Sequence, residues 1–146
     1  MKALVLGMLL GAAQSVAGDE LTLQYPAAEP LLVVAAEGKG ESQSIGSYVL
    51  RLYRVDNPDF PRDHYLHGIV RPRDGVLERL EFIGVDPHGA LGLMVVMRSV
   101  GTGSYLRAEA FEVVSGRLSW RASTDSLPAE ADPAGLLRQQ LGWSGR

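Results

Sequence analysis

The apolar residues of this chain gather in short segments separated by turn residues, which is a pattern typical of β-strands. Leu80 and Phe82 fall on one face of a strand, whereas Arg79 and Glu81 fall on the other. The most apolar segment, 91–97, is expected at the centre of a sheet. The segments interpreted as strands cover positions 21–25, 31–36, 47–53, 64–70, 76–83, 91–97, 105–114 and 117–122.

Turn and helix signals complete this pattern. The dipeptides at 74–75 (Asp-Gly) and 115–116 (Ser-Gly) favour tight turns between strands. A short helix is predicted over 134–141, because Asp132 can cap its start and Gly142 can end it. About eight short strands with no helices between them predict an all-β fold, an antiparallel β-sandwich or barrel with a short C-terminal helix.

Several single side chains have predicted environments. Leu106, Ala108 and Ala110 alternate along one predicted strand and are expected to point into the core. Arg73, like most arginines, is expected in solvent. Trp143 lies close to the chain end, where fraying is common.

The first 17 residues have the organisation of a secretory signal peptide. Met1 and Lys2 give a positive start, 3–13 is almost entirely apolar, and small residues stand at Ser15 and Ala17. Cleavage is expected after position 17 or 18, which leaves a single domain over 18–146. The alternative is a buried N-terminal helix. No second long apolar run occurs, so we expect a soluble, exported protein that does not insert into the membrane after cleavage.

Charge and cysteine content exclude several classes of function. The chain has 14 basic and 17 acidic residues, and removal of Lys2 with the signal peptide leaves 13 and 17, a net charge near −4. A mildly acidic protein is a poor candidate for binding nucleic acid. The chain contains no cysteine, so thiol catalysis, zinc–thiolate sites and iron–sulfur clusters are also excluded.

The three histidines do not form a recognisable catalytic or metal-binding motif. His64 and His67 are three positions apart on a predicted strand and should face opposite sides, while His88 lies in a turn. Zinc requires three or four converging ligands. Asp63 beside His64 does not make a catalytic triad, which requires a particular geometry with a nucleophile. We therefore expect no metal, no cofactor and no enzymatic activity.

The segment 99–105 is the strongest candidate for a functional site. Its two glycines allow the backbone to protrude and to approach a partner closely. Its hydroxyl groups can donate and accept hydrogen bonds, and its tyrosine offers a rigid aromatic surface suited to an interface. The segment precedes a strand, which argues against a phosphate-binding loop. The predicted partner-binding residues are Ser99, Gly101, Thr102, Gly103, Ser104 and Tyr105.

Four blocks of sequence in this order resemble the periplasmic inhibitors of invertebrate-type (I-type) lysozyme of Gram-negative bacteria. They cover 44–48, 57–61, 66–75 and 95–105, within a region of similarity from about 43 to 114. The resemblance implies an antiparallel β-fold, often dimeric, and a protruding loop that plugs the active-site cleft of the lysozyme. It also implies a periplasmic location.

The loop motif of that family is Ser-Gly-x-Tyr. The matching positions here are Thr102, Gly103, Ser104 and Tyr105, so threonine replaces the first serine and adds a methyl group to its hydroxyl. The resemblance therefore implies that this loop binds I-type lysozyme.

Three other functions are compatible with an exported β-protein. A small-molecule- or lipid-binding β-barrel would require a large apolar lumen, whereas the alternation here favours side chains that fill the core. An enzyme would require His64 or His67 to meet Asp63 and a serine in one cleft. A structural or assembly role would be favoured by exposed apolar edge strands.

Overall fold

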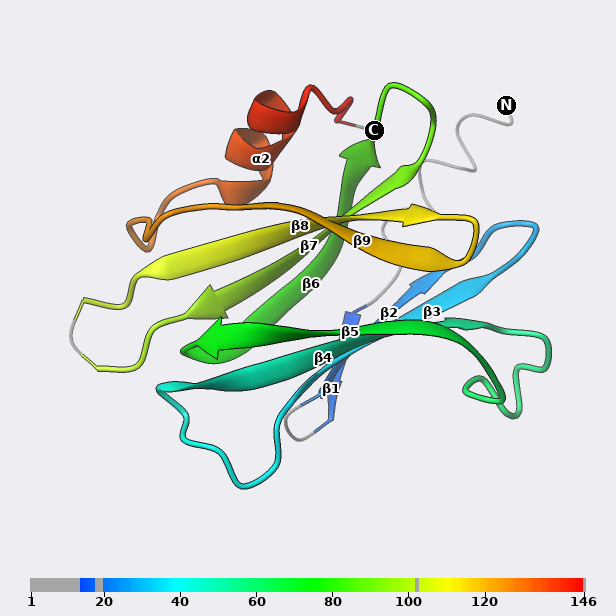
Figure 1. The fold of residues 1–146 in the computed structure, drawn as a ribbon, viewed down its shortest axis with the longest axis horizontal. Helices are drawn as coiled ribbons and strands as arrows, with labels where there is room; N and C mark the ends of the chain where they lie inside the picture. Colours follow the sequence, from blue (N-terminus) through cyan, green and yellow to red (C-terminus); the bar gives the residue numbers. More distant parts are fainter. Residues whose placement is uncertain (1–13, 18–19, 102, 146) are drawn as a thin grey trace.

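A computed structural model describes residues 14–17, 20–101 and 103–145 (Figure 1). Within these ranges the chain forms nine strands and a helix near the C-terminus, α2. Their bounds are β1 Gln14–Ala17, β2 Glu20–Tyr25, β3 Leu31–Glu37, β4 Ile45–Arg54, β5 His64–Asp74, β6 Val76–Val85, β7 Leu91–Arg98, β8 Leu106–Val114, β9 Arg117–Ser123 and α2 Pro133–Leu141.

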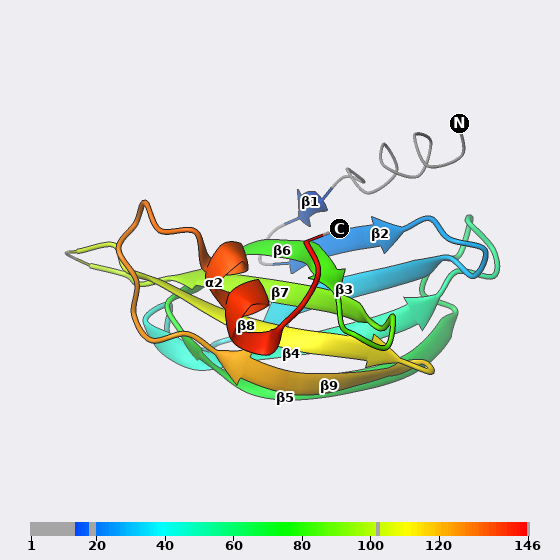
Figure 2. The ribbon, with the colours of Figure 1, turned by 90° about the horizontal axis from the view of Figure 1, so that it is seen from above.

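The strands form two antiparallel sheets in which sequence neighbours pair. The first sheet has the order β1-β2-β3-β4-β5 and the second has the order β6-β7-β8-β9. The sheets stack face to face (Figure 2), with β2 and β3 against β6 and with β5 against β9. The fold is therefore a β-sandwich, which confirms the predicted fold class. The predicted central position of the most apolar segment, now β7, is also confirmed.

The main core lies between the two sheets and follows the strand alternation. Along β4, Tyr48, Leu50 and Leu52 turn toward the second sheet and are almost completely buried. They meet the inward faces of the second sheet, chiefly Leu80, Leu93, Val95, Met97, Phe111 and Val113. The interior of the sandwich is thus filled by side chains, as the sequence pattern predicted.

Strand β8 is buried on both faces, and the predicted burial of Leu106, Ala108 and Ala110 is confirmed. These three side chains face away from the first sheet, into a second core beneath α2. Their small size suits this position, because Leu137 of α2 has to pack closely on the sheet. Trp143 belongs to the same core and is only 7% exposed, so its predicted fraying is wrong.

Helix α2 begins and ends as the sequence predicted. The side chain of Asp132 accepts a hydrogen bond from the backbone N–H of Gly135, and Pro133 occupies the first turn. Gly142 ends the helix with a φ of 70°, a left-handed conformation that favours glycine. After the helix, Ser144 pairs with Val85, which fixes the C-terminal segment to the edge of the second sheet.

Candidate functional site: the loop between strands β7 and β8

The β7–β8 loop protrudes from one end of the sandwich (Figures 1 and 2). Two hydrogen bonds close its base. The backbone N–H of Ser99 donates to the carbonyl of Tyr105 at 2.8 Å, and the backbone N–H of Tyr105 donates to Ser99 Oγ at 2.8 Å. Ser99, one of the predicted site residues, therefore uses its hydroxyl to hold the base of the loop together.

The loop turns through left-handed backbone conformations. Gly101 and Gly103 have φ angles of 106° and 99°, a region that glycine adopts at little steric cost. Ser104 has a φ of 51°, which is uncommon for a residue with a side chain and has to be held by its surroundings.

Arg98 holds Ser104 in this conformation. Its Nη1 donates to Ser104 Oγ at 3.1 Å and to the carbonyl oxygen of Ser104 at 3.3 Å. The other side of the guanidinium is bound by Glu78, with Nη2 donating to Oε2 at 3.0 Å and Nε donating to Oε1. The carboxylate of Glu78 raises the pKa of Arg98 above its ordinary value. Arg98 thus connects β6, the end of β7 and the loop.

The turn from β5 to β6 supports the same region. Gly75 has a φ of 98°, and a Cβ atom there would lie only 2.1 Å from the carbonyl oxygen of Arg98. Glycine is therefore required for the turn to pack against the end of β7.

Arg73 anchors the neighbouring β3–β4 loop and corrects the expectation of a solvated arginine. It is only 2% exposed and donates to the carbonyls of Ser42, Gln43, Ser47 and Gly75 at 2.6–3.1 Å. A buried cation with four backbone acceptors holds this end of the sandwich rigid.

Among the described residues of the β7–β8 loop, Tyr105 offers the largest exposed side chain. Tyr105 is 52% exposed, Gly101 and Gly103 are exposed, and Ser104 is half-buried. The ring of Tyr105 packs over Gly103, since a Cβ at that position would lie 2.6 Å from a ring carbon. Thr102 lies outside the described residues. Sequence analysis missed Glu78, whose role depends on a cross-strand contact.

The histidines do not converge. His64 Nδ1 lies 2.6 Å from Asp56 Oδ2, which contributes to the lowered pKa of Asp56. His67 Nδ1 accepts a hydrogen bond from the backbone N–H of Leu118 at 2.9 Å, across the two sheets, and His88 lies in the β6–β7 turn. In the part of the chain that the structure describes, no three acidic or histidine side chains are arranged to hold a metal ion.

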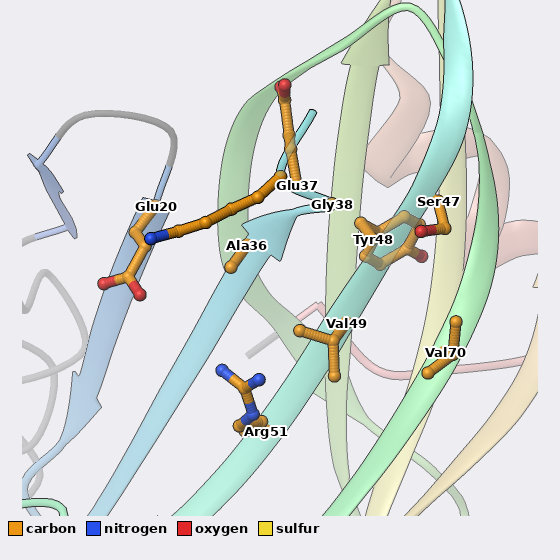
Figure 3. A pocket seen from close by; sticks show the side chains of 10 residues that line it. Glu20, Ala36, Glu37, Gly38, Ser47, Tyr48, Val49, Arg51 and Val70 are labelled. Carbon is orange, nitrogen blue, oxygen red and sulfur yellow. The ribbon is translucent and has the colours of Figure 1, made fainter. Parts of the chain in front are cut away.

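A depression lies on the outer face of the first sheet, beside the β3–β4 loop (Figure 3). Its lining combines charged and apolar side chains, with Arg51 beside Val49 and Val70. This lining differs from the large apolar lumen that the lipid-binding alternative would require. Among the described residues, no helix is long and apolar enough to cross a membrane.

Comparison with known proteins identifies the class to which this β-sandwich belongs. Residues 18–141 match the family model described as periplasmic lysozyme inhibitor of I-type lysozyme. One similar solved structure is the crystal structure of such an inhibitor from Aeromonas hydrophila, whose sequence is 35% identical to this chain. The two structures have a TM-score of 0.69, and the similarity covers 80% of this chain and 98% of that chain. No curated protein matches the sequence.

A second similar structure is the Aeromonas hydrophila inhibitor in complex with the lysozyme of Meretrix lusoria. The inhibitor in that complex is 38% identical in sequence to this chain, with a TM-score of 0.68. The match covers 74% of this chain and 87% of that chain. The chain belongs to the family of periplasmic inhibitors of I-type lysozyme. It is therefore an inhibitor protein of the periplasm that acts on I-type lysozyme and not an enzyme.

Proposed function

We propose that the protein inhibits I-type lysozyme by inserting the β7–β8 loop, residues 99–105, into the active-site cleft of the enzyme. The observation that carries this proposal is the shape of the loop, which protrudes from one end of the sandwich and carries an exposed tyrosine, Tyr105. Lysozymes hydrolyse glycans between two carboxyl groups in a cleft, and a narrow loop with hydroxyl donors can occupy such a cleft and exclude the sugar.

The contacts at the base of the loop and at Ser104 support tight binding. The Ser99–Tyr105 hydrogen bonds and the Arg98–Ser104 contacts hold the loop before a partner arrives. A loop that is already ordered loses less conformational entropy on binding. The mildly acidic charge of the exported chain also favours its approach to a basic enzyme surface.

The proposal is tested by an assay of cell-wall lysis with I-type and chicken-type lysozymes and the exported protein. Tyr105→Ala should weaken inhibition of the I-type enzyme by about tenfold or more, since a central aromatic anchor contributes about 2 kcal/mol or more at an interface. Phe60→Ala is a matched control, because Phe60 is 64% exposed and lies in the β4–β5 loop at the other end of the sandwich (Figure 1). Equal inhibition by both variants would locate the binding surface elsewhere.

Homodimer formation is part of the same proposal. The outer face of β4 and β5 exposes three large apolar side chains, Ile45, Tyr65 and Val70, which are between 55% and 71% exposed. Exposed apolar surface of this kind favours association. Light scattering coupled to size-exclusion chromatography should give twice the mass of the chain, and Val70→Lys should give the monomer mass. A monomer at all concentrations would contradict dimer formation.

A further inference from the structure

We propose that Arg98 and Glu78 are positioning residues that turn the hydroxyl of Ser104 into a hydrogen-bond donor for a carboxylate of the lysozyme. This inference rests on the proposed insertion of the loop. It assigns a function to a salt bridge that lies outside the loop motif and gives Ser104 a role distinct from that of Tyr105.

Arg98 acts on the hydroxyl of Ser104 only as a hydrogen-bond donor. A guanidinium group can only donate, so the contact of 3.1 Å between Arg98 Nη1 and Ser104 Oγ uses an acceptor lone pair of the hydroxyl. The hydroxyl hydrogen of Ser104 is therefore left for another acceptor. No described residue accepts it, and the side chain is only half-buried, so this hydrogen is available to a partner.

The positive charge of Arg98 makes the hydroxyl of Ser104 a stronger donor. A hydroxyl group that accepts from a cation is polarised, and its hydrogen becomes a better donor to an anion. The side chain of Arg98 is 31% exposed, so its charge is only partly screened by solvent. The chemical group that fits this arrangement is a carboxylate oxygen, which is a strong acceptor for the polarised hydroxyl.

Glu78 orients the guanidinium of Arg98. Its carboxylate binds Nε and Nη2 of Arg98 in a bidentate pair, which leaves Nη1 directed at Ser104. Such forked pairs fix the plane of the guanidinium. Without Glu78, Arg98 could rotate away, and Ser104 would lose the contact that supports its φ of 51°.

A double-mutant cycle tests the inference through the dissociation constant for I-type lysozyme. Arg98→Gln and Ser104→Ala should each weaken binding by about tenfold or more, because each change removes a hydrogen bond that involves a charged group. The double variant should be no more than about twofold weaker than Ser104→Ala alone, since the two residues act through one hydroxyl. Arg98→Lys keeps the positive charge but cannot donate to Glu78 and Ser104 through separate nitrogen atoms, and should give an intermediate affinity.

Controls separate this inference from loss of folding and from failure of the loop proposal. Arg54→Gln makes the same change in charge at a side chain that is 39% exposed, and binding should stay as in the unchanged protein. All variants should keep the β-sheet circular dichroism spectrum of the unchanged protein. Binding unaffected by Arg98→Gln, or additive effects in the double variant, would overturn the inference while Tyr105→Ala still weakens binding. If Tyr105→Ala and Ser104→Ala both leave binding intact, the loop proposal and this inference fail together.

Discussion

The guanidinium of Arg71 on β5 lies 2.6 Å from the carboxylate of Glu109 on β8, and this ion pair connects the two sheets of the sandwich. Glu109 is 5% exposed and also accepts a hydrogen bond from the hydroxyl of Tyr48. Burial, and next the nearby Glu109 charge, raise the pKa of Tyr48 well above its ordinary range, so Tyr48 stays a donor. Arg71 also stacks on Trp120, 4.6 Å from the ring centroid.

Glu109→Gln should destabilise the protein by about 3 kcal/mol, because the change removes one partner of a largely buried ion pair and leaves Arg71 uncompensated. The free energy of unfolding from urea titrations measures this effect. Glu81→Gln is a suitable control, since Glu81 pairs with Arg79 at 3.0 Å where both side chains are about 40% exposed. Glu81→Gln should lower the free energy of unfolding by less than about 1 kcal/mol. An equally small decrease for Glu109→Gln would contradict a stabilising role of the Arg71–Glu109 ion pair.

Asp86 in the β6–β7 turn and Glu112 on the neighbouring strand β8 have carboxyl pKa values shifted in opposite directions, so both should make stability depend on pH. The backbone N–H of Ala90, followed by weaker contributions that include that of His88, lowers the pKa of Asp86. Burial, followed by the hydrogen bond with Asp86, raises the pKa of Glu112 above its ordinary value of 4.5. A raised carboxyl pKa stabilises the folded protein below the unfolded pKa and penalises it as the pH rises through the folded pKa.

Glu112→Gln should therefore raise the unfolding temperature at pH 7 and have little effect below about pH 4. Asp86→Asn should do the opposite at pH 7, because a lowered pKa stabilises the folded state above the unfolded pKa and loses this effect as the pH falls. Thermal unfolding at the two pH values checks both signs. A lower unfolding temperature for Glu112→Gln at pH 7 would contradict this assignment.

Gly103→Ala should weaken inhibition of I-type lysozyme more than Gly101→Ala. Both positions have similar left-handed φ angles, so the backbone strain is matched. A Cβ at Gly103 would displace the ring of Tyr105, whereas one at Gly101 meets nothing within 4 Å. The ratio of the two inhibition constants measures the contribution of the ring position, and equal constants would mean that the position of Tyr105 is unimportant.

Cleavage of the predicted signal peptide can be measured directly. The match to the family model begins at residue 18, which supports cleavage after Ala17 or Gly18. Intact-mass spectrometry of the periplasmic protein should give a chain that starts at residue 18 or 19. A mass that still includes the first 17 residues would contradict cleavage, and β1 would then remain attached to β2.

Local patterns in the sequence were sufficient to predict the sandwich, the helix and the candidate loop. Alternation placed Leu80 on a buried face, and Asp132 with Gly142 marked the helix ends, because these signals depend on neighbouring residues only. The burial of Arg73 could not be predicted, since three of its four carbonyl acceptors belong to a segment about 30 residues earlier. The burial of Trp143 likewise depends on packing against Gly92, and the Arg98–Glu78 pair depends on strand register.

Competition with substrate is the most direct test of the central claim that the loop occupies the active-site cleft. The affinity of the exported protein for I-type lysozyme would be measured at increasing concentrations of a chitin oligosaccharide that binds the cleft. If the loop inserts there, the apparent dissociation constant should rise in proportion to the oligosaccharide concentration once the cleft is saturated. An apparent dissociation constant that stays the same at saturating oligosaccharide would contradict insertion and would place the inhibitory contact outside the cleft.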